Sequence, residues 1–270
     1  MLYLPKGIEN MPELPDLEVF KSNLSKRLIS KCLTGLKVFN LNKVIVPESI
    51  LTNELCNRNL LSIDRIGKEL YFDFGDQRTV AAHLMLNGEM SIFPKDKVPD
   101  VKFKIFSMDF KNESLVFSDK GGLCTIKYKP PKDKVPDALD ASFTLEYLKR
   151  IAHKKNRVNI KAFLIDQKIV KGIGNAYVDE ILWDARISPH SLTGNIPDDV
   201  LGTLYNSIGT VLKSAIESIR KIAPDIISGE ERSFLKVHNK TKKQTETGHK
   251  IIVEKIASKI TYYTGEQVLY

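Results

Sequence analysis

The sequence predicts an α+β protein of more than one domain: an N-terminal β domain with a leading helix, a helical domain, and a small C-terminal β region. Three patterns carry this prediction. Residues 16–32 repeat apolar side chains at helical spacing, and residues 34–128 alternate short β-forming runs with Gly, Asp and Asn turns. Helical patterns follow in residues 144–224, and short β-like runs return in residues 236–270.

The leading helix is amphipathic, because Leu17, Phe20, Leu24 and Leu28 fall on one helical face. The β runs after it repeat at the spacing typical of a sandwich or barrel, and we expect a β-sandwich. These runs cover residues 34–40, 60–75, 79–93, 101–110 and 114–128.

A stretch rich in Pro, Lys and Asp has the composition of a linker and separates the two main domains. Helical patterns after it cover residues 144–155, 159–167, 174–185 and 197–224. The expected division is an extension at 1–10, the N-terminal β-sandwich domain at 11–128, the linker at 129–142, the helical domain at 143–235 and the C-terminal β region at 236–270.

Composition favours a polyanionic partner without deciding for one. The 270 residues are 42% hydrophobic and 27% charged, and 41 Lys and Arg against 33 Asp and Glu leave a net charge of +8. No apolar run approaches the roughly 18 residues that span a bilayer, so we expect no membrane partner. Three widely spaced Cys residues predict no disulfide framework and favour a reduced intracellular compartment.

Gly172 and Gly174 lie just before a helix that begins near Asn175. Glycines at such a place let backbone N–H groups at a helix N-terminus approach a phosphate, and the helix dipole favours the anion. An isolated Gly-x-Gly is equally compatible with a plain turn between two packed helices.

Two distant segments together carry a family resemblance. Met-Pro-Glu-Leu-Pro-Asp (11–16) and Gly-Ile-Gly-Asn (172–175) resemble, in this order, the formamidopyrimidine-DNA glycosylase and endonuclease VIII family of DNA repair enzymes. The resemblance runs from Met11 to the C-terminus. It implies a helix–two-turn–helix in the helical domain, double-stranded DNA with damaged bases as partner, and no cofactor. Nothing in it requires more than a monomer, located in the cytoplasm at a bacterial nucleoid or in a eukaryotic nucleus.

The resemblance implies that Pro12, exposed once Met11 is removed, attacks C1′ of a damaged nucleotide. A secondary amine with an α-amino pKa of about 8 is substantially unprotonated at neutral pH, so it can attack and then form an iminium. Glu13 would transfer protons during opening of the sugar ring. The same residues are also compatible with a Pro-rich lead-in whose helix N-cap is Asp16, and both interpretations can hold. Asp16 stands where the family more often has Glu.

Two further stretches resemble family segments in the β domain. Arg-Ile-Gly-Lys resembles a family hairpin, which would bring Lys68 to the lesion phosphate and the active site as a catalytic residue beside Pro12 and Glu13. His-Leu-Met-Leu-Asn-Gly would place His83 and Asn87 by the DNA backbone, with Leu86 filling the gap that a flipped base leaves. A solvated hairpin Lys and a strand end with its apolar residues in the core are the plain alternatives.

In the helical domain, Lys161 matches a family Lys near the lesion phosphate, Asp166 a structural position, and Asn175 the family's phosphate-binding Asn. Two departures bear on the substrate. Ser-Asp-Lys-Gly-Gly-Leu-Cys replaces a family loop that inserts Arg and Phe opposite the lesion, so that Leu123 takes the place of Phe and base reading should be weak. Residues 223–240 are shorter than the base-capping segment of 8-oxoguanine enzymes, which favours oxidised pyrimidines or ring-opened purines.

The C-terminal region departs most from the family. The family's zinc finger has two Cys-x-x-Cys pairs, and the corresponding positions here are Gln244, Thr247, Thr264 and Gln267. None is a zinc ligand, because zinc prefers thiolate, imidazole or carboxylate groups, and His238 and His249 fit isolated surface residues better. We therefore expect no metal and a zincless finger, a β-hairpin held by apolar packing. Lys259 takes the place of the finger's Arg and keeps its charge but not its planar fork.

The leading functional hypothesis is a DNA glycosylase that also acts as an AP lyase by β-elimination and δ-elimination. The alternatives are a catalytically inactive damaged-DNA-binding protein on the same scaffold and an unrelated nucleic-acid-binding protein. Pro12 decides between the first two, because with residues 1–11 attached its nitrogen is a tertiary amide and not a nucleophile. Met11 is accordingly the chemically sensible start. A miscalled start codon or residues added at cloning is our preferred account of residues 1–10, ahead of a natural inhibitory extension.

Overall fold

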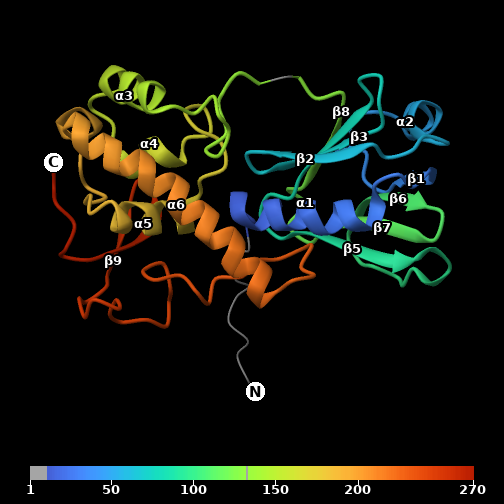
Figure 1. Cartoon of the computed structure of the whole chain (residues 1–270). Helices are drawn as coiled ribbons and strands as arrows, with labels where there is room; N and C mark the ends of the chain where they lie inside the picture. The colour runs from blue at the N-terminus through green and yellow to red at the C-terminus, as the bar shows by residue number, and fades with distance from the viewer. Residues whose placement is uncertain (1–10, 132) are drawn as a thin grey trace. The chain divides into compact units, whose positions relative to one another are not determined.

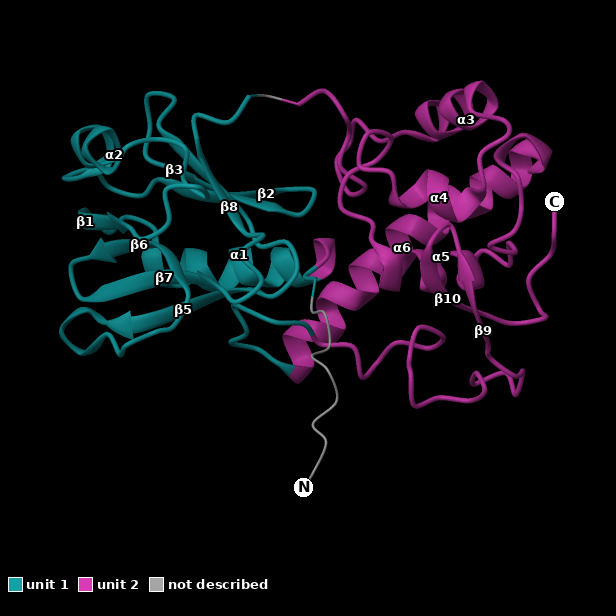
Figure 2. Cartoon of the chain, turned by 180° about the vertical axis from the view of Figure 1, so that it is seen from behind, with its two compact units in different colours: residues 1–12, 16–132, 223–230 teal, residues 13–15, 133–222, 231–270 magenta. Residues whose placement is uncertain are grey.

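The structure, a computed structural model, describes residues 11–131 and 133–270. The chain divides into two compact units (Figure 2). Within the described part, the first unit contains residues 11–12, 16–131 and 223–230, and the second contains residues 13–15, 133–222 and 231–270. The expected extension at 1–10 lies outside the described residues.

Figure 1 labels most of the helices and strands, and their order along the chain is as follows. The elements of the N-terminal half are α1 (Leu14–Leu28), β1 (Leu33–Val38), α2 (Glu48–Leu55), β2 (Ser62–Ile66), β3 (Glu69–Asp73), β4 (Thr79–His83), β5 (Gly88–Pro94), η1 (Lys95–Lys97), β6 (Lys104–Phe110), β7 (Glu113–Asp119) and β8 (Thr125–Tyr128). Those of the C-terminal half are α3 (Leu145–Lys154), α4 (Ile160–Ile165), α5 (Asn175–Asp184), η2 (Thr193–Asn195), α6 (Asp198–Ile222), β9 (Ile252–Ile256) and β10 (Lys259–Tyr263).

The first unit is a β-sandwich, as predicted. One four-stranded sheet has the order β1-β6-β7-β5 and the other the order β2-β3-β4-β8, and all pairs of neighbouring strands are antiparallel. Sequential strands that alternate buried and exposed residues pack this way because each sheet has one apolar face to bury.

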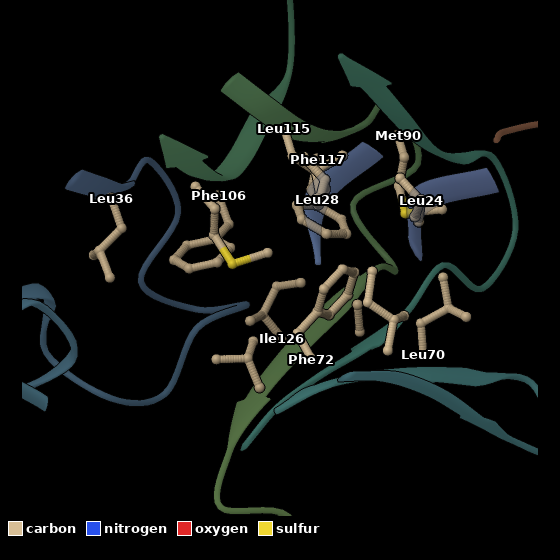
Figure 3. Packing of buried hydrophobic residues seen from close by; sticks show 14 of the residues in the cluster. Leu24, Leu28, Leu36, Leu70, Phe72, Met90, Phe106, Leu115, Phe117 and Ile126 are labelled. Atoms are coloured by element: carbon tan, nitrogen blue, oxygen red, sulfur yellow. The ribbon is translucent and has the colours of Figure 1, made fainter. Parts of the chain in front are cut away.

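The core of the first unit lies between these sheets and includes the apolar face of α1. Figure 3 shows Phe72 from β3 and Phe117 from β7 among the packed side chains, and their rings meet edge to face with centroids 6.0 Å apart. The four apolar residues predicted for one face of the leading helix are all buried, namely Leu17, Phe20, Leu24 and Leu28. The amphipathic pattern therefore identified the buried face correctly.

The boundaries of α1 differ from the prediction. The helix begins at Leu14, so Asp16 lies in its first turn rather than at its N-cap, where a carboxylate still interacts well with the helix dipole. It ends at Leu28, and Ser30 has a left-handed φ of 66°. Helix α2 was not predicted, although Leu51 and Leu55, one turn apart on it, are both buried.

Helix α5 is the most enclosed element of the second unit: every residue from Ala176 to Trp183 is buried. Helix α6 is the longest, with 25 residues. Strands β9 and β10 form an antiparallel hairpin whose turn residues Ala257 and Ser258 both have positive φ, as a type I′ turn requires.

Two features differ from the expected domain boundaries. Residues 223–230 group with the first unit rather than the helical domain, because Asn23 donates from Nδ2 to the carbonyls of Pro224 and Ile226 at 2.8 and 2.9 Å. The C-terminal β region groups with the helices of the second unit, where Trp183 packs in one apolar cluster with Tyr262. No helix within residues 11–131 and 133–270 is long and apolar enough to cross a membrane.

Replacing Phe117 by Ala should lower the free energy of unfolding by about 3–5 kcal/mol, because it leaves a cavity beside Phe72 and Phe106. Chemical denaturation measures the loss. Ile45→Ala is the matched control, since Ile45 is 83% exposed and its truncation should change stability by less than about 0.5 kcal/mol. Equal losses in the two variants would contradict the packing described for the sandwich.

Candidate active site and DNA-contacting residues

The carboxylate of Glu13 binds the N-terminus of α5. The backbone N–H of Ala176 donates to its Oε1 at 2.9 Å, and that of Tyr177 approaches its Oε2 at 3.5 Å. Glu13 is only 3% exposed, so a distant residue caps the helix and meets the positive end of its dipole. These are the N–H groups that the sequence assigned to a phosphate, and in the structure they hold a carboxylate.

The glycine turn before α5 positions the start of α1. The backbone N–H of Leu14 donates to the carbonyl of Gly172 at 3.2 Å. Gly172 has φ of +101°, and a Cβ there would lie 2.5 Å from Cδ1 of Leu14. The side chain of Gln167 holds this turn, because it accepts a hydrogen bond from the Gly172 N–H and donates one to the Ile173 carbonyl. The glycine is therefore required both by its backbone conformation and by the close approach of Leu14.

Asn175 lies at the first residue of α5 and contacts the C-terminal hairpin. Its Nδ2 donates to the carbonyl of Ile260 on β10 at 3.0 Å. Its Oδ1 is buried and, among the described side chains, has no hydrogen-bond partner. An amide nitrogen carries two hydrogens, so one donor of Asn175 is left beyond the bond to Ile260.

Lys161, on α4, is fully buried rather than on the surface. Its Nζ donates to Asp179 Oδ1 at 2.8 Å, to Thr261 Oγ1 at 2.7 Å and to the Ile260 carbonyl at 3.3 Å. Burial lowers the pKa of Lys161, against the opposing effect of the Asp179 carboxylate. The three donors of this ammonium thus hold β10 against the helices, and direct contact of Lys161 with a phosphate stays a prediction.

Asp179 connects the hairpin to α5 from the other side. Its Oδ2 accepts from the Tyr262 N–H at 2.9 Å and from His238 Nδ1 at 2.7 Å. His238 has only 20% of its side chain exposed and stacks on Tyr262, with ring centroids 4.6 Å apart. It is therefore not an isolated surface residue, contrary to the prediction. Lys259 is exposed at the start of β10.

In the first unit, Lys68 and His83 lie close together. Lys68 follows Gly67, whose φ of 61° forms the tight turn between β2 and β3, and Lys68 is only 9% exposed. His83 pairs across the sheet with Glu69. Burial lowers the pKa of His83, and Lys68 and Lys127 lower it further against the opposing Glu69. Its Nδ1 accepts from the Met85 N–H at 3.0 Å, which leaves Nε2 as the N–H donor of a neutral ring.

Leu86 and Asn87 lie on a strained turn between β4 and β5. Met85 and Asn87 have φ of 54° and 65°, which is uncommon for residues other than glycine. The N–H of Gly88 donates to the Leu84 carbonyl at 3.1 Å, and a Cβ on Gly88 would lie 2.1 Å from that oxygen. Strain of this kind is concentrated at functional sites, and Asn87 is exposed on this turn.

Asp119 organises the neighbouring loop that carries Leu123. Its carboxylate accepts from the backbone N–H groups of Gly121 at 2.6 Å, of Leu123, and of Cys124 at 2.7 Å. A Cβ on Gly121 would lie 3.7 Å from the carbonyl oxygen of Leu86, so the two loops touch. The structure thus brings together the two loops that carry Leu86 and Leu123, with Leu123 41% exposed. Asp119 was not singled out from the sequence, although Asp followed by Gly-Gly is a typical loop signal.

Pro12 immediately precedes Glu13 in the chain and is buried. The site residues predicted from the sequence divide between the two units. Glu13, Lys161, Asn175 and Lys259 lie in the second unit, and the first unit holds Pro12, Lys68, Leu86, Leu123 and the pair His83 and Asn87. Among the described residues, no group of three or more His, Cys, Asp or Glu side chains could hold a metal ion.

Gly172→Ala should destabilise the protein by about 1–3 kcal/mol and move Glu13, because the new methyl collides with Leu14 in a conformation that alanine disfavours. Denaturation measures the loss of stability. The rate at which borohydride traps the protein on abasic DNA measures the displacement of Glu13. Gly202→Ala is the control: a Cβ there meets open space within α6, and alanine should gain up to about 1 kcal/mol. Unchanged stability in Gly172→Ala would contradict the geometry of the turn.

Lys161→Met should cost about 3–5 kcal/mol, because it leaves the carboxylate of Asp179 buried without its ammonium partner. Urea denaturation gives the value, and Lys255→Met, at an exposed position of the same hairpin, serves as the control. A loss no larger than that of the control would show that the Lys161–Asp179 pair does not hold the hairpin.

Two family models match the chain in sequence. The formamidopyrimidine-DNA glycosylase N-terminal domain matches residues 11–126, and the H2TH domain of the same enzymes matches residues 135–224. A formamidopyrimidine-DNA glycosylase of Carboxydothermus hydrogenoformans is 31% identical over 261 residues, covering 94% of this chain and 98% of that protein. One from Lactococcus lactis subsp. lactis is 28% identical over 267 residues, covering 94% and 97%.

Solved structures agree with the sequence matches. The Lactococcus lactis Fpg in complex with DNA containing an abasic site superposes with a TM-score of 0.84 at 25% identity, covering 95% of this chain and 99% of that one. The same protein bound to DNA containing an oxidised pyrimidine gives 0.84 at 26% identity, with the same coverage. On these matches, which span both units, the chain belongs to the formamidopyrimidine-DNA glycosylase family.

Proposed function

We propose that the protein is a base-excision repair enzyme that removes oxidised bases from double-stranded DNA and cleaves the resulting abasic site through the amine of Pro12. The observation that carries this function is the placement of Glu13. A carboxylate that directly follows the nucleophile is held by the N-terminus of α5, at the turn matched by the family's H2TH model. No cofactor takes part.

The reaction proceeds by nucleophilic catalysis. The lone pair of the Pro12 nitrogen forms a bond to C1′ as the bond from C1′ to the base breaks. The base leaves with the electron pair of the broken bond, and the proton released by the Pro12 amine balances the proton that the base takes up. Opening of the sugar ring, with a proton delivered to O4′, converts the adduct into an iminium. Loss of a C2′ proton then expels the 3′ phosphate, and a second elimination expels the 5′ phosphate.

Glu13 is suited to deliver the proton to O4′. Its Oε1 accepts a well-formed hydrogen bond from Ala176, while the 3.5 Å approach of Tyr177 to Oε2 is long. The bond to Ala176 therefore fixes the carboxylate beside Pro12, where it can exchange a proton with the sugar.

The remaining site residues would bind DNA. Neutral His83 offers Nε2–H, exposed Asn87 offers its amide, and Lys68 supplies positive charge beside them. In the second unit, the free amide hydrogen of Asn175 and the ammonium of Lys259 would meet phosphates. Lys161 contributes indirectly, since it shares the Ile260 carbonyl with Asn175 and so orients that amide.

Leu86 and Leu123 would fill the space left by the flipped base, since the two loops that carry them touch. Neither side chain reads a base edge by hydrogen bonds, so discrimination of the opposite base should be weak. The short segment at residues 223–240 favours oxidised pyrimidines or ring-opened purines over 8-oxoguanine as the lesion. Bacterial relatives support action at the nucleoid in the cytoplasm.

The test compares two forms of the chain, one beginning at Met1 and one at Met11, incubated with abasic-site DNA and borohydride. Borohydride reduces the iminium to a stable covalent adduct. We expect an adduct only from the Met11 form, because the Pro12 nitrogen of the Met1 form is an amide with no basic lone pair. Peptide mapping should place the adduct on Pro12.

Pro12→Gly should abolish this adduct in the Met11 form or slow it strongly, and Glu13→Gln should reduce it by about 10²-fold or more, the scale of general acid catalysis. Equal capture by the Met1 form would refute Pro12 as nucleophile and indicate a Lys side chain. Tight binding to lesion DNA without any adduct from either form would favour the inactive DNA-binding alternative.

A further inference from the structure

The C-terminal β region packs on α5 through a small apolar core. That cluster contains four buried residues, namely Trp183, Val237, Ile251 and Tyr262. So few side chains remove little apolar area from water, and a region of this size usually needs a cross-link such as a bound metal. Polar contacts must therefore supply much of the cohesion.

Carboxylates supply these contacts at two successive residues of α5. Asp179 binds Lys161, His238 and the Tyr262 N–H, as described above. Glu180 accepts from the backbone N–H groups of three consecutive residues, at 2.9, 2.7 and 2.7 Å, which are those of Lys236, Val237 and His238. These bonds hold the segment before the hairpin, but they do not reach the two turns at residues 244–250 and 264–267.

Glu266 joins those two turns to the end of α5. Its Oε2 accepts from Thr247 Oγ1 at 2.9 Å, from Thr264 Oγ1 at 3.2 Å and from the indole N–H of Trp183 at 3.2 Å. Its Oε1 pairs with Arg186 Nη1 at 2.6 Å and with His249 Nδ1 at 3.4 Å. We name this set the Glu266 cluster: Glu266 with Trp183, Arg186, Thr247, His249 and Thr264.

We propose that Glu266 is a positioning residue whose carboxylate cross-links the C-terminal finger in place of a metal ion. Thr247 and Thr264 stand at two of the positions that correspond to zinc ligands in the family, one in each turn, and both donate to the same oxygen of Glu266. The charge at the centre of the cross-link is reversed. Here an anion accepts hydrogen bonds from donors, whereas in a metal site a cation is bound by its ligands.

The cluster satisfies the requirements for a partly enclosed charge. Glu266 has 11% of its side chain exposed, and the guanidinium of Arg186 compensates its charge directly while stacking 5.1 Å from the ring centroid of Trp183. Although burial opposes ionisation, the hydrogen bonds from Thr247, Trp183 and Arg186 lower the pKa of Glu266 to about 2. The cross-link is therefore charged throughout the physiological range.

The consequence for function rests on the proposed role in DNA binding. Strand β10 carries Lys259 and the Ile260 carbonyl that orients Asn175, and it leads directly into the turn that contains Glu266. A finger released from α5 would lose phosphate contacts, while Pro12 and Glu13 would keep their places. The effect should therefore appear in DNA affinity rather than in the chemical step.

The experiment compares Glu266→Ala with Glu246→Ala in the full chain from Met11. Glu246 lies in the same finger and is the matched control, since its side chain is 68% exposed and meets Lys236 only at 4.0 Å. Three quantities are measured: amide hydrogen exchange of residues 244–270, fluorescence of Trp183, and borohydride capture as a function of DNA concentration. Trp183 is the only tryptophan of the chain, so its emission reports on this cluster alone.

Glu266→Ala should lose exchange protection in the finger, shift the Trp183 emission to longer wavelength and raise the half-saturating DNA concentration by at least tenfold. The capture rate at saturating DNA should stay within about threefold, and Glu246→Ala should match the unsubstituted chain. Unchanged protection in Glu266→Ala would overturn the cross-link. Lost protection with unchanged half-saturation would overturn its role in positioning the DNA contacts. Failure of the unsubstituted chain to capture DNA would refute the proposed function instead, and the exchange data would still decide the cross-link.

Discussion

The capping of α5 by Glu13 is the interaction on which the candidate site depends. Four N–H groups at a helix N-terminus have no partner within the helix, and here two of them turn toward a carboxylate more than 160 positions away in sequence. The contact ties the beginning of the chain to the glycine turn, and the bond from Leu14 to Gly172 reinforces it. Because Pro12 directly precedes Glu13, any displacement of this contact would displace the proposed nucleophile as well.

Carboxylates that accept hydrogen bonds occur along the whole length of helix α5. Its N-terminus binds Glu13, its middle carries Asp179 and Glu180, and its last turn presents Trp183 to Glu266. Burial raises the pKa of Glu180, and the three backbone N–H groups that it accepts oppose this effect. A helix buried on all sides can carry these charges only because each has donors in place.

Sequence patterns predicted the elements whose periodicity is local. The four apolar positions of α1 are buried, and the sandwich follows from its alternating strands. Helix α2 was not predicted, because its eight residues include only two buried positions, which are too few to establish a helical period. His238 was misjudged for a different reason: its partner Asp179 lies 59 positions away, and no local pattern reveals such a pair.

The sequence by itself determined the family and the order of its two matched domains, because these reside in segments whose residue types are characteristic. It also pointed to Pro12 and Glu13 as the residues proposed to act on DNA. The tertiary structure decided which groups meet. It placed Glu13 at the start of α5, buried Lys161 where it bonds to β10, and assembled the Glu266 cluster from three separate segments. Such contacts join residues that are far apart in the chain, and their distances and burial arise only when the helices and the hairpin pack.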